Sequence, residues 1–90
     1  MIAYIYLMIN LSTFKKSIEE PTEYILYEDS HKYILETICG TIGLYSIYIE
    51  LSIEEISDYK INGNMTISNL AKNIRENIDL QKKRGIPIHP

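Results

Sequence analysis

The feature that most constrains the fold is the strict alternation of side chains between residues 44 and 51. One face of this segment is apolar and the other is mixed, with Tyr45, Ile47, Ile49 and Leu51 set against Ser46, Tyr48 and Glu50. Such alternation is typical of a strand in an antiparallel sheet with one buried and one solvated face. Segments 23–28 and 32–39 are also rich in Tyr, Ile and Leu, and each is followed by turn residues. The three segments therefore predict an antiparallel meander.

Two helices are predicted after the meander. Ser52-Ile53-Glu54-Glu55 is a capping box, in which Ser52 and Glu55 can each accept a hydrogen bond from the other's backbone amide. This helix is expected over residues 53–61, with three inward side chains: Ile53, Ile56 and Tyr59. The next is expected over residues 67–80, because its apolar residues form one stripe: Ile67, Leu70, Ala71, Ile74 and Ile78.

The N-terminal third is harder to interpret. Residues 2–9 form an apolar run without clear periodicity, which fits a strand covered on both sides but fits a buried helix as well. Ser12 can then cap a short helix that extends to about Glu20 and is stopped by Pro21. Phe14 and Ile18, four residues apart, would face inward from it.

These elements predict the α+β class, as a two-layer sandwich. An antiparallel meander of three to four strands carries two C-terminal helices packed on one face. The 90 residues are expected to form a single domain over 1–90, with residues 81–90 as an extended C-terminal tail. With 46% hydrophobic residues, the chain can build a core without disulfides or metal ions.

A cytoplasmic, non-membrane protein is expected. The apolar run at residues 2–9 is far shorter than the roughly 20 residues of a membrane-spanning helix. It also has no preceding Lys or Arg and no small-residue cleavage site of the kind that a signal peptide needs. Cys39 is the single cysteine, so an intrachain disulfide is excluded, and a small buried hydrophobic role at a strand end is expected for it.

Neither a catalytic constellation nor a metal site is predicted, and no cofactor is expected. A dyad of Cys39 and His31 would have to bridge the length of one predicted strand, about 26 Å. Glu28-Asp29-x-His31 offers oxygen and nitrogen ligands, but a metal site normally needs more ligands than this turn supplies. Glu54 and Glu55 are interpreted as helix-start residues, since neighbouring helix positions do not face each other.

The middle of the chain is the candidate protein-binding surface. The net charge is −3, and acidic residues gather between positions 19 and 36. Tyrosines among carboxylates suit protein binding, because Tyr supplies a large contact area and one hydrogen-bonding hydroxyl. A plain exposed sheet surface is the alternative to a binding role. The candidate partner-binding residues, expected on the solvated face and its turn, are Tyr27, Glu28, Asp29, Glu36, Tyr48 and Glu50.

From Tyr24 to Arg75 the organisation resembles that of small immunity proteins encoded beside bacterial polymorphic or contact-dependent toxins. The resemblance rests on the tyrosine-rich meander, on Leu51-Ser52-x-Glu54-Glu55 and on Leu70-Ala71-x-x-Ile74-Arg75. It implies a non-catalytic inhibitor that binds and neutralises a cognate toxin domain. Many such toxins are nucleases with basic clefts, which an acidic surface would complement.

A second hypothesis is a small regulatory or nucleic-acid-associated module. It would use the basic residues of the C-terminal region: Lys72, Arg75, Lys82, Lys83 and Arg84. The acidic net charge makes direct nucleic-acid binding the weaker hypothesis, because phosphate attraction needs a basic surface. A small enzyme is the least favoured of the three functional hypotheses. Homo-oligomers through the N-terminal apolar segment are compatible with each of these functions.

Overall fold

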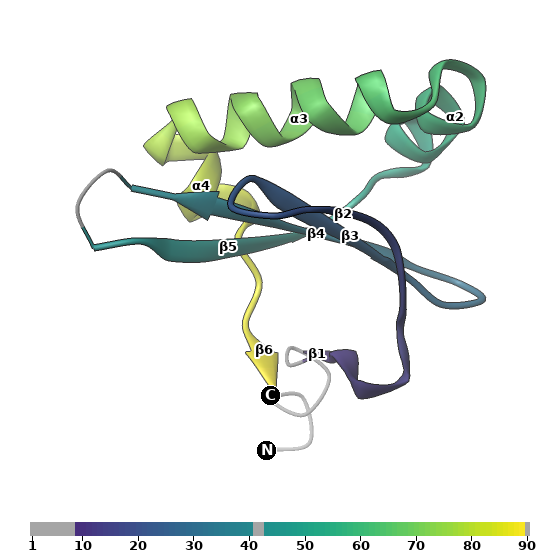
Figure 1. Ribbon diagram of the computed structural model, residues 1–90, viewed down its shortest axis with the longest axis horizontal. Helices are drawn as coiled ribbons and strands as arrows, with labels where there is room; N and C mark the ends of the chain where they lie inside the picture. The colour runs from purple at the N-terminus through teal and green to yellow at the C-terminus, as the bar shows by residue number, and fades with distance from the viewer. Residues whose placement is uncertain (1–8, 41–42, 90) are drawn as a thin grey trace.

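The computed structural model describes residues 9–40 and 43–89, and it has the predicted α+β class (Figure 1). Its main sheet is antiparallel, and its strands follow the order of the chain: β2 (Lys15–Glu20), β3 (Tyr24–Glu28), β4 (Tyr33–Cys39) and β5 (Tyr45–Glu50). The predicted meander of three strands is confirmed as β3, β4 and β5. A fourth strand, β2, precedes them.

The helices follow the sheet in the chain: α2 (Ile53–Asn62), α3 (Asn64–Glu76) and α4 (Ile78–Arg84). Figure 1 shows α2 and α3 above one face of the sheet, while α4 turns back toward β5. The predicted capping box is present at the start of α2, where Glu55 N donates to Ser52 Oγ at 3.2 Å and Ser52 N donates to Glu55 Oε1 at 2.8 Å.

The main core lies between the sheet and α3. Leu26, Leu35 and Ile49, from three adjacent strands, are 0% exposed and belong to one cluster with Ile67 and Ile74 of α3. This confirms the predicted apolar stripe for the part that α3 contains. Burial of this apolar surface is the main force that holds the layers together.

α2 packs more lightly on the same face. Ile56 and Tyr59 contact the edge of the core, and Tyr59 meets Tyr33 of β4 edge to face, with ring centroids 5.9 Å apart. Ile53, predicted to face inward, is 80% exposed instead. It is the first residue of α2, directly after the N-cap residue Ser52, and therefore lies at the end of the helix rather than over the sheet.

The predicted helix over residues 67–80 is interrupted at Asn77, because α3 stops at Glu76 and α4 starts at Ile78. Asn77 adopts an extended conformation, with φ −132°, and its side chain accepts a hydrogen bond from Leu80 N at 3.1 Å. Asparagine competes with helical hydrogen bonds in this way and favours helix starts. Residues 81–84, predicted as the start of the extended tail, belong to α4, and the extended segment begins at Gly85.

The predicted helix over residues 12–20 is also wrong. The chain forms a short 3-10 helix, η1 (Leu11–Thr13), and then enters β2, which pairs with β3. Phe14 and Ile18 fit an inward helix face, but pairing with β3 lets residues 15–20 complete the hydrogen bonds of a sheet edge. Pro21 therefore opens the turn of a β-hairpin, in which Thr22 has φ 68°.

The two ends of the described chain meet on the sheet face opposite the helices (Figure 1). β1 (Ile9–Asn10) and β6 (Ile88–His89) form a parallel pair. Before β6, the chain is tied to the edge of the main sheet, since Ile86 N donates to Tyr48 O at 2.8 Å. Most of the apolar run predicted as a strand or a buried helix lies outside the described residues, and only its last residue is in β1.

Candidate functional site

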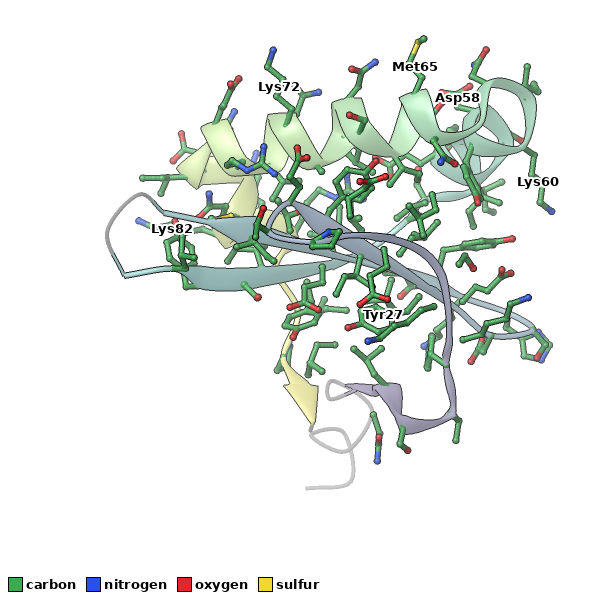
Figure 2. The ribbon with its side chains drawn as sticks, in the orientation of Figure 1. Tyr27, Asp58, Lys60, Met65, Lys72 and Lys82 are labelled. Carbon is green, nitrogen blue, oxygen red and sulfur yellow. The ribbon has the colours of Figure 1, made fainter. Side chains whose placement is uncertain are left out.

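Three of the six predicted partner-binding residues meet on the sheet face opposite the helices. Tyr27 of β3, Glu36 of β4 and Tyr48 of β5 point to this face, because they alternate with the core residues of their strands. Glu36 and Tyr48 are directly opposite each other in the sheet register. Figure 2 shows Tyr27 on the side of the sheet away from α3.

A fourth side chain, Ser46 of β5, completes the group, which we call the tyrosine–glutamate cluster: Tyr27, Glu36, Ser46 and Tyr48. The carboxylate of Glu36 is at its centre. Tyr27 Oη donates to Glu36 Oε1 at 2.7 Å, and Ser46 Oγ donates to Glu36 Oε2 at 2.7 Å. Two strands that flank β4 thus fix both carboxylate oxygens, so the orientation of this negative charge is set before any partner binds.

The two tyrosines of the cluster are held in the neutral form. Burial raises the pKa of Tyr27 far above its usual value, and the hydrogen bond to Glu36 and the charge of Glu36 raise it further. Burial and the nearby Glu36 charge also raise the pKa of Tyr48. Each effect disfavours a phenolate next to the carboxylate. Both phenols therefore stay protonated at neutral pH.

Among the described residues, the carboxylate of Glu36 is hydrogen-bonded by hydroxyl groups and is not paired with a cation. Within the described part of the chain, the ion pairs are Lys16–Glu19 at 3.5 Å and Arg84–Glu55 at 2.7 Å, and neither involves Glu36. Neutral donors orient a carboxylate but leave its net charge in place. The cluster therefore presents a fixed negative charge on this face of the sheet.

The other three predicted residues lie at different places. Glu50 is on the same face as Tyr48, two residues further along β5, and its side chain is exposed. Glu28 follows Tyr27 and points to the helix side of the sheet, where it accepts a hydrogen bond from Ser17 Oγ. Asp29 caps the β3–β4 turn and accepts from His31 N at 2.8 Å and Lys32 N at 2.7 Å. These amide donors lower the pKa of Asp29.

The exposure of the cluster differs from what the sequence predicts. Tyr27 is 9% exposed, so most of its ring is covered, whereas Glu36 and Tyr48 are half-buried. Ile34, next to Tyr27 in the sheet and on the same face, is 0% exposed. This face is therefore only partly solvated. In Figure 1, η1, β1 and β6 lie on this side of the sheet.

Ser46 is the cluster residue that sequence reasoning missed. The alternation in β5 places it on the same face as Tyr48. Its bond to Glu36, however, depends on the register between β4 and β5, in which Ser46 is opposite Ile38 and diagonal to Glu36. The register follows from the connection between the strands as well as from their pattern, so the sequence alone did not identify this contact.

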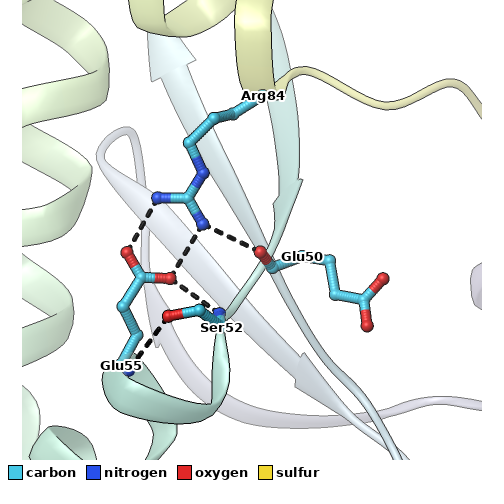
Figure 3. Close-up of polar contacts among 4 residues, drawn as sticks. All are labelled: Glu50, Ser52, Glu55 and Arg84. Atoms are coloured by element: carbon cyan, nitrogen blue, oxygen red, sulfur yellow. Dashed lines mark hydrogen bonds and ion pairs between the residues drawn. The ribbon is translucent and has the colours of Figure 1, made fainter.

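Arg84, one of the basic C-terminal residues, forms a structural clamp (Figure 3). Its guanidinium holds the Glu55 carboxylate through two bonds, of 2.7 and 2.8 Å, and Nη2 also donates to Glu50 O at 3.0 Å. The hydrogen bond from Arg84 is the main cause that lowers the pKa of Glu55. One side chain of α4 thereby joins the capping box of α2 to the end of β5.

Arg75 is also engaged inside the molecule. Its Nε donates to Ile38 O at 3.1 Å and its Nη2 donates to Glu23 O at 3.1 Å, so it ties α3 to the ends of two strands. Of the predicted basic group, the three lysines have exposed side chains: Lys72, Lys82 and Lys83. The two arginines, which suit phosphate recognition best, are already bound to other groups of the chain.

Cys39 and His31 lie at opposite ends of the β4 region, as predicted. Cys39 is the last residue of β4 and is 0% exposed, and burial raises the pKa of its thiol. His31 is exposed in the turn before β4. Among residues 9–40 and 43–89, no three His, Cys, Asp or Glu side chains are grouped so as to hold a metal ion. None of the helices in this part of the chain has the length and apolar character needed to cross a membrane.

Comparisons of the chain with models of protein families, with curated proteins and with solved structures find no match in any of the three.

Proposed function

We propose that this chain is a non-catalytic protein-binding module that binds and neutralises a cognate bacterial toxin domain, as an immunity protein does. The observation that carries the proposal is the carboxylate of Glu36, which is oriented by Tyr27 and Ser46 and has no ion-pair partner among the described residues. A preoriented charge without a counter-ion can pair with a cation of another molecule at little cost in side-chain ordering.

The surroundings of Glu36 support a basic protein partner. Tyr48 stands opposite Glu36 in the sheet and offers a half-buried aromatic ring, and the exposed carboxylate of Glu50 follows on the same strand face. A tyrosine anchor with carboxylates at its rim fits a surface rich in Lys and Arg, such as the cleft of a nuclease toxin domain. In this arrangement Tyr48 supplies contact area, while Glu50 attracts the partner during encounter.

The proposal is tested first by co-expression. A toxin-like protein encoded beside the gene of this chain is expected to co-purify with it and to lose its toxicity when the chain is present. The proposed role would be contradicted if the neighbouring genes encode only metabolic proteins and no partner co-purifies with the chain.

The partner-binding face is tested by kinetics with that toxin domain. Glu50→Lys is expected to slow association by about three- to tenfold at low salt and to weaken its salt dependence. Tyr48→Ala is expected to speed dissociation by about tenfold or more, because it removes an anchor side chain. Glu54→Lys is the matched control: it makes the same charge change at an exposed position of α2, and wild-type kinetics are expected for it. Wild-type kinetics for the two test variants as well, with the fold intact, would place the interface elsewhere.

The nucleic-acid hypothesis receives less support. Arg75 and Arg84 are bound to backbone carbonyls and to Glu55, so a phosphate would have to compete with these contacts. The remaining exposed group is Lys72, Lys82 and Lys83 on α3 and α4. DNA or RNA binding with a steep salt dependence, lost on charge reversal of these lysines, would favour this hypothesis over the first.

A further inference from the structure

The outer edge of β2, Lys15–Glu20, is unpaired in the part of the chain that the structure describes. β2 is the first strand in the order of the main sheet, and within the described residues no strand pairs with its outer side. An edge of this kind carries backbone N–H and C=O groups that another strand can bind. The four charged side chains of the strand are all exposed: Lys15, Lys16, Glu19 and Glu20.

The charges of β2 are complementary to those of a second copy of the same strand. The sequence Lys-Lys-Ser-Ile-Glu-Glu has its cations at one end and its anions at the other. When two copies run antiparallel about the midpoint between Ser17 and Ile18, Lys15 stands opposite Glu20 of the second copy and Lys16 stands opposite Glu19. Each pair occurs twice, because the two-fold axis repeats it. Opposite charges at facing positions of adjacent strands stabilise their pairing.

The sides of the sheet match as well as the charges. Lys15 and Glu20 are opposite Glu28 and Tyr24 of β3, which point to the helix side. Lys16 and Glu19 form an ion pair at 3.5 Å, so both lie on one side of the strand, and their partners in β3 point away from the helices. The bulge between Lys16 and Ile18 adds one residue to the strand. Lys15 and Glu20 therefore share one side of the sheet although they are five positions apart. In the antiparallel pairing, each lysine therefore meets a glutamate on its own side of the sheet.

Charged edge strands commonly protect a protein from association, but this pattern discriminates between pairings. Parallel pairing of two copies in register would set Lys15 and Lys16 against themselves, and Glu19 and Glu20 against themselves. The antiparallel arrangement about the midpoint removes these like-charge contacts and replaces them with ion pairs. The same side chains therefore oppose parallel association and favour one antiparallel register.

We propose that this chain forms a symmetric homodimer through antiparallel pairing of its two β2 edges. The dimer joins two four-stranded sheets into one continuous sheet, with the helices of both copies on the same side. It leaves the tyrosine–glutamate cluster of each copy accessible, because that cluster involves strands β3 to β5. The proposal goes beyond the function proposed above and does not depend on it.

The test is a charge-swap experiment with the full chain, read by sedimentation velocity over a series of concentrations. The wild type is expected to associate to a dimer. Lys15→Glu/Lys16→Glu and Glu19→Lys/Glu20→Lys are each expected to raise the dimer dissociation constant by about tenfold or more, because like charges then face each other. A mixture of these two variants is expected to restore the dimer. The variant that carries all four changes, with the charge order inverted, is expected to form a homodimer again.

Lys82→Glu/Lys83→Glu is the control matched to Lys15→Glu/Lys16→Glu, since it makes the same change in net charge on exposed residues of α4. It is expected to leave the dimer unchanged. Circular dichroism of each variant checks that the fold is retained, and the four-change variant, which has the wild-type composition, serves if a two-change variant does not fold. A monomeric wild type at all concentrations would overturn the proposal. A dimer insensitive to both two-change variants, or one weakened equally by the control, would also overturn it.

Discussion

The two faces of the main sheet are held by different kinds of interaction. On the helix side, Leu26, Leu35 and Ile49 are 0% exposed and pack against the apolar stripe of α3. On the other side, Tyr27 is nearly as well buried, yet its hydroxyl is bound to the carboxylate of Glu36. The first face relies on apolar contact, which has no preferred direction, and the second adds hydrogen bonds between specific atoms.

This difference separates the source of stability from the candidate site. Apolar packing tolerates exchange between side chains of similar volume, so the helix side gives little basis for recognition of a particular partner. The cluster on the opposite side fixes one carboxylate through hydroxyls from two neighbouring strands. Its hydrogen bonds depend on the identity of each residue. Mutations on the two faces should therefore differ in the size and the kind of their effect on stability.

The largest effect is expected on the helix side. Ile74 of α3 is 0% exposed, and Ile74→Asp would bury a carboxylate without a partner. Its free energy of unfolding should fall by about 3–5 kcal/mol, as measured by urea denaturation. Asn73→Asp, at the adjacent exposed position of α3, is the control and should change it by less than about 0.5 kcal/mol. Equal stability of the two variants would mean that the α3 stripe does not form the main core.

The helix side is also the part that sequence reasoning predicted well. Alternation identified β5 and its two faces, and the capping box located the start of α2, because both signals involve residues close together in the chain. The apolar stripe located α3 for the same reason. These patterns report which side chains face the core, and Ile53 at the start of α2 is an exception.

The errors arise where distant residues decide the structure. Residues 15–20 become a strand because β3 is available to pair with them, and a local helical pattern does not contain that information. Asn77 interrupts the second helix, although the spacing of Ile74 and Ile78 is correct for a continuous one. In the site, the sequence found Tyr27, Glu36 and Tyr48, but their contacts depend on the register of three strands.

An intermediate effect is expected at the Arg84–Glu55 clamp, which belongs to neither face of the sheet. Arg84→Met should lower the free energy of unfolding by about 2 kcal/mol at pH 7, because it removes charge-assisted hydrogen bonds in a half-buried position. Lys83→Met, exposed on the same helix, is the control and should have little effect. The measurement is urea denaturation of both variants.

The clamp should also make stability sensitive to acid. Since Arg84 lowers the pKa of Glu55 in the folded state, the stabilisation is present above the ordinary Glu pKa of about 4.3 and is lost as pH falls through the lower folded value. Glu55→Gln should therefore show a flatter loss of stability between about pH 5 and pH 3 than the wild type. An identical acid dependence of the two proteins would contradict this account of the clamp.

The smallest effect on stability is expected at the tyrosine–glutamate cluster, where loss of the Tyr27 hydroxyl is compared with loss of the Tyr48 hydroxyl. Tyr27→Phe removes the 2.7 Å bond to Glu36 and should lower the free energy of unfolding by about 1 kcal/mol. Tyr48→Phe removes a hydroxyl on the same face and should change the free energy of unfolding by less than half as much, since its ring, not its hydroxyl, is assigned the main role.

The Tyr27–Glu36 bond should also make stability sensitive to alkali. Because the folded state raises the pKa of Tyr27, the stabilisation by this tyrosine is complete below about pH 10 and is lost as pH rises further. The wild type should therefore lose stability above about pH 10 more steeply than Tyr27→Phe does, and Tyr48→Phe should resemble the wild type more closely. Equal losses for the two variants would mean that the Tyr27–Glu36 bond does not distinguish this face from the apolar one.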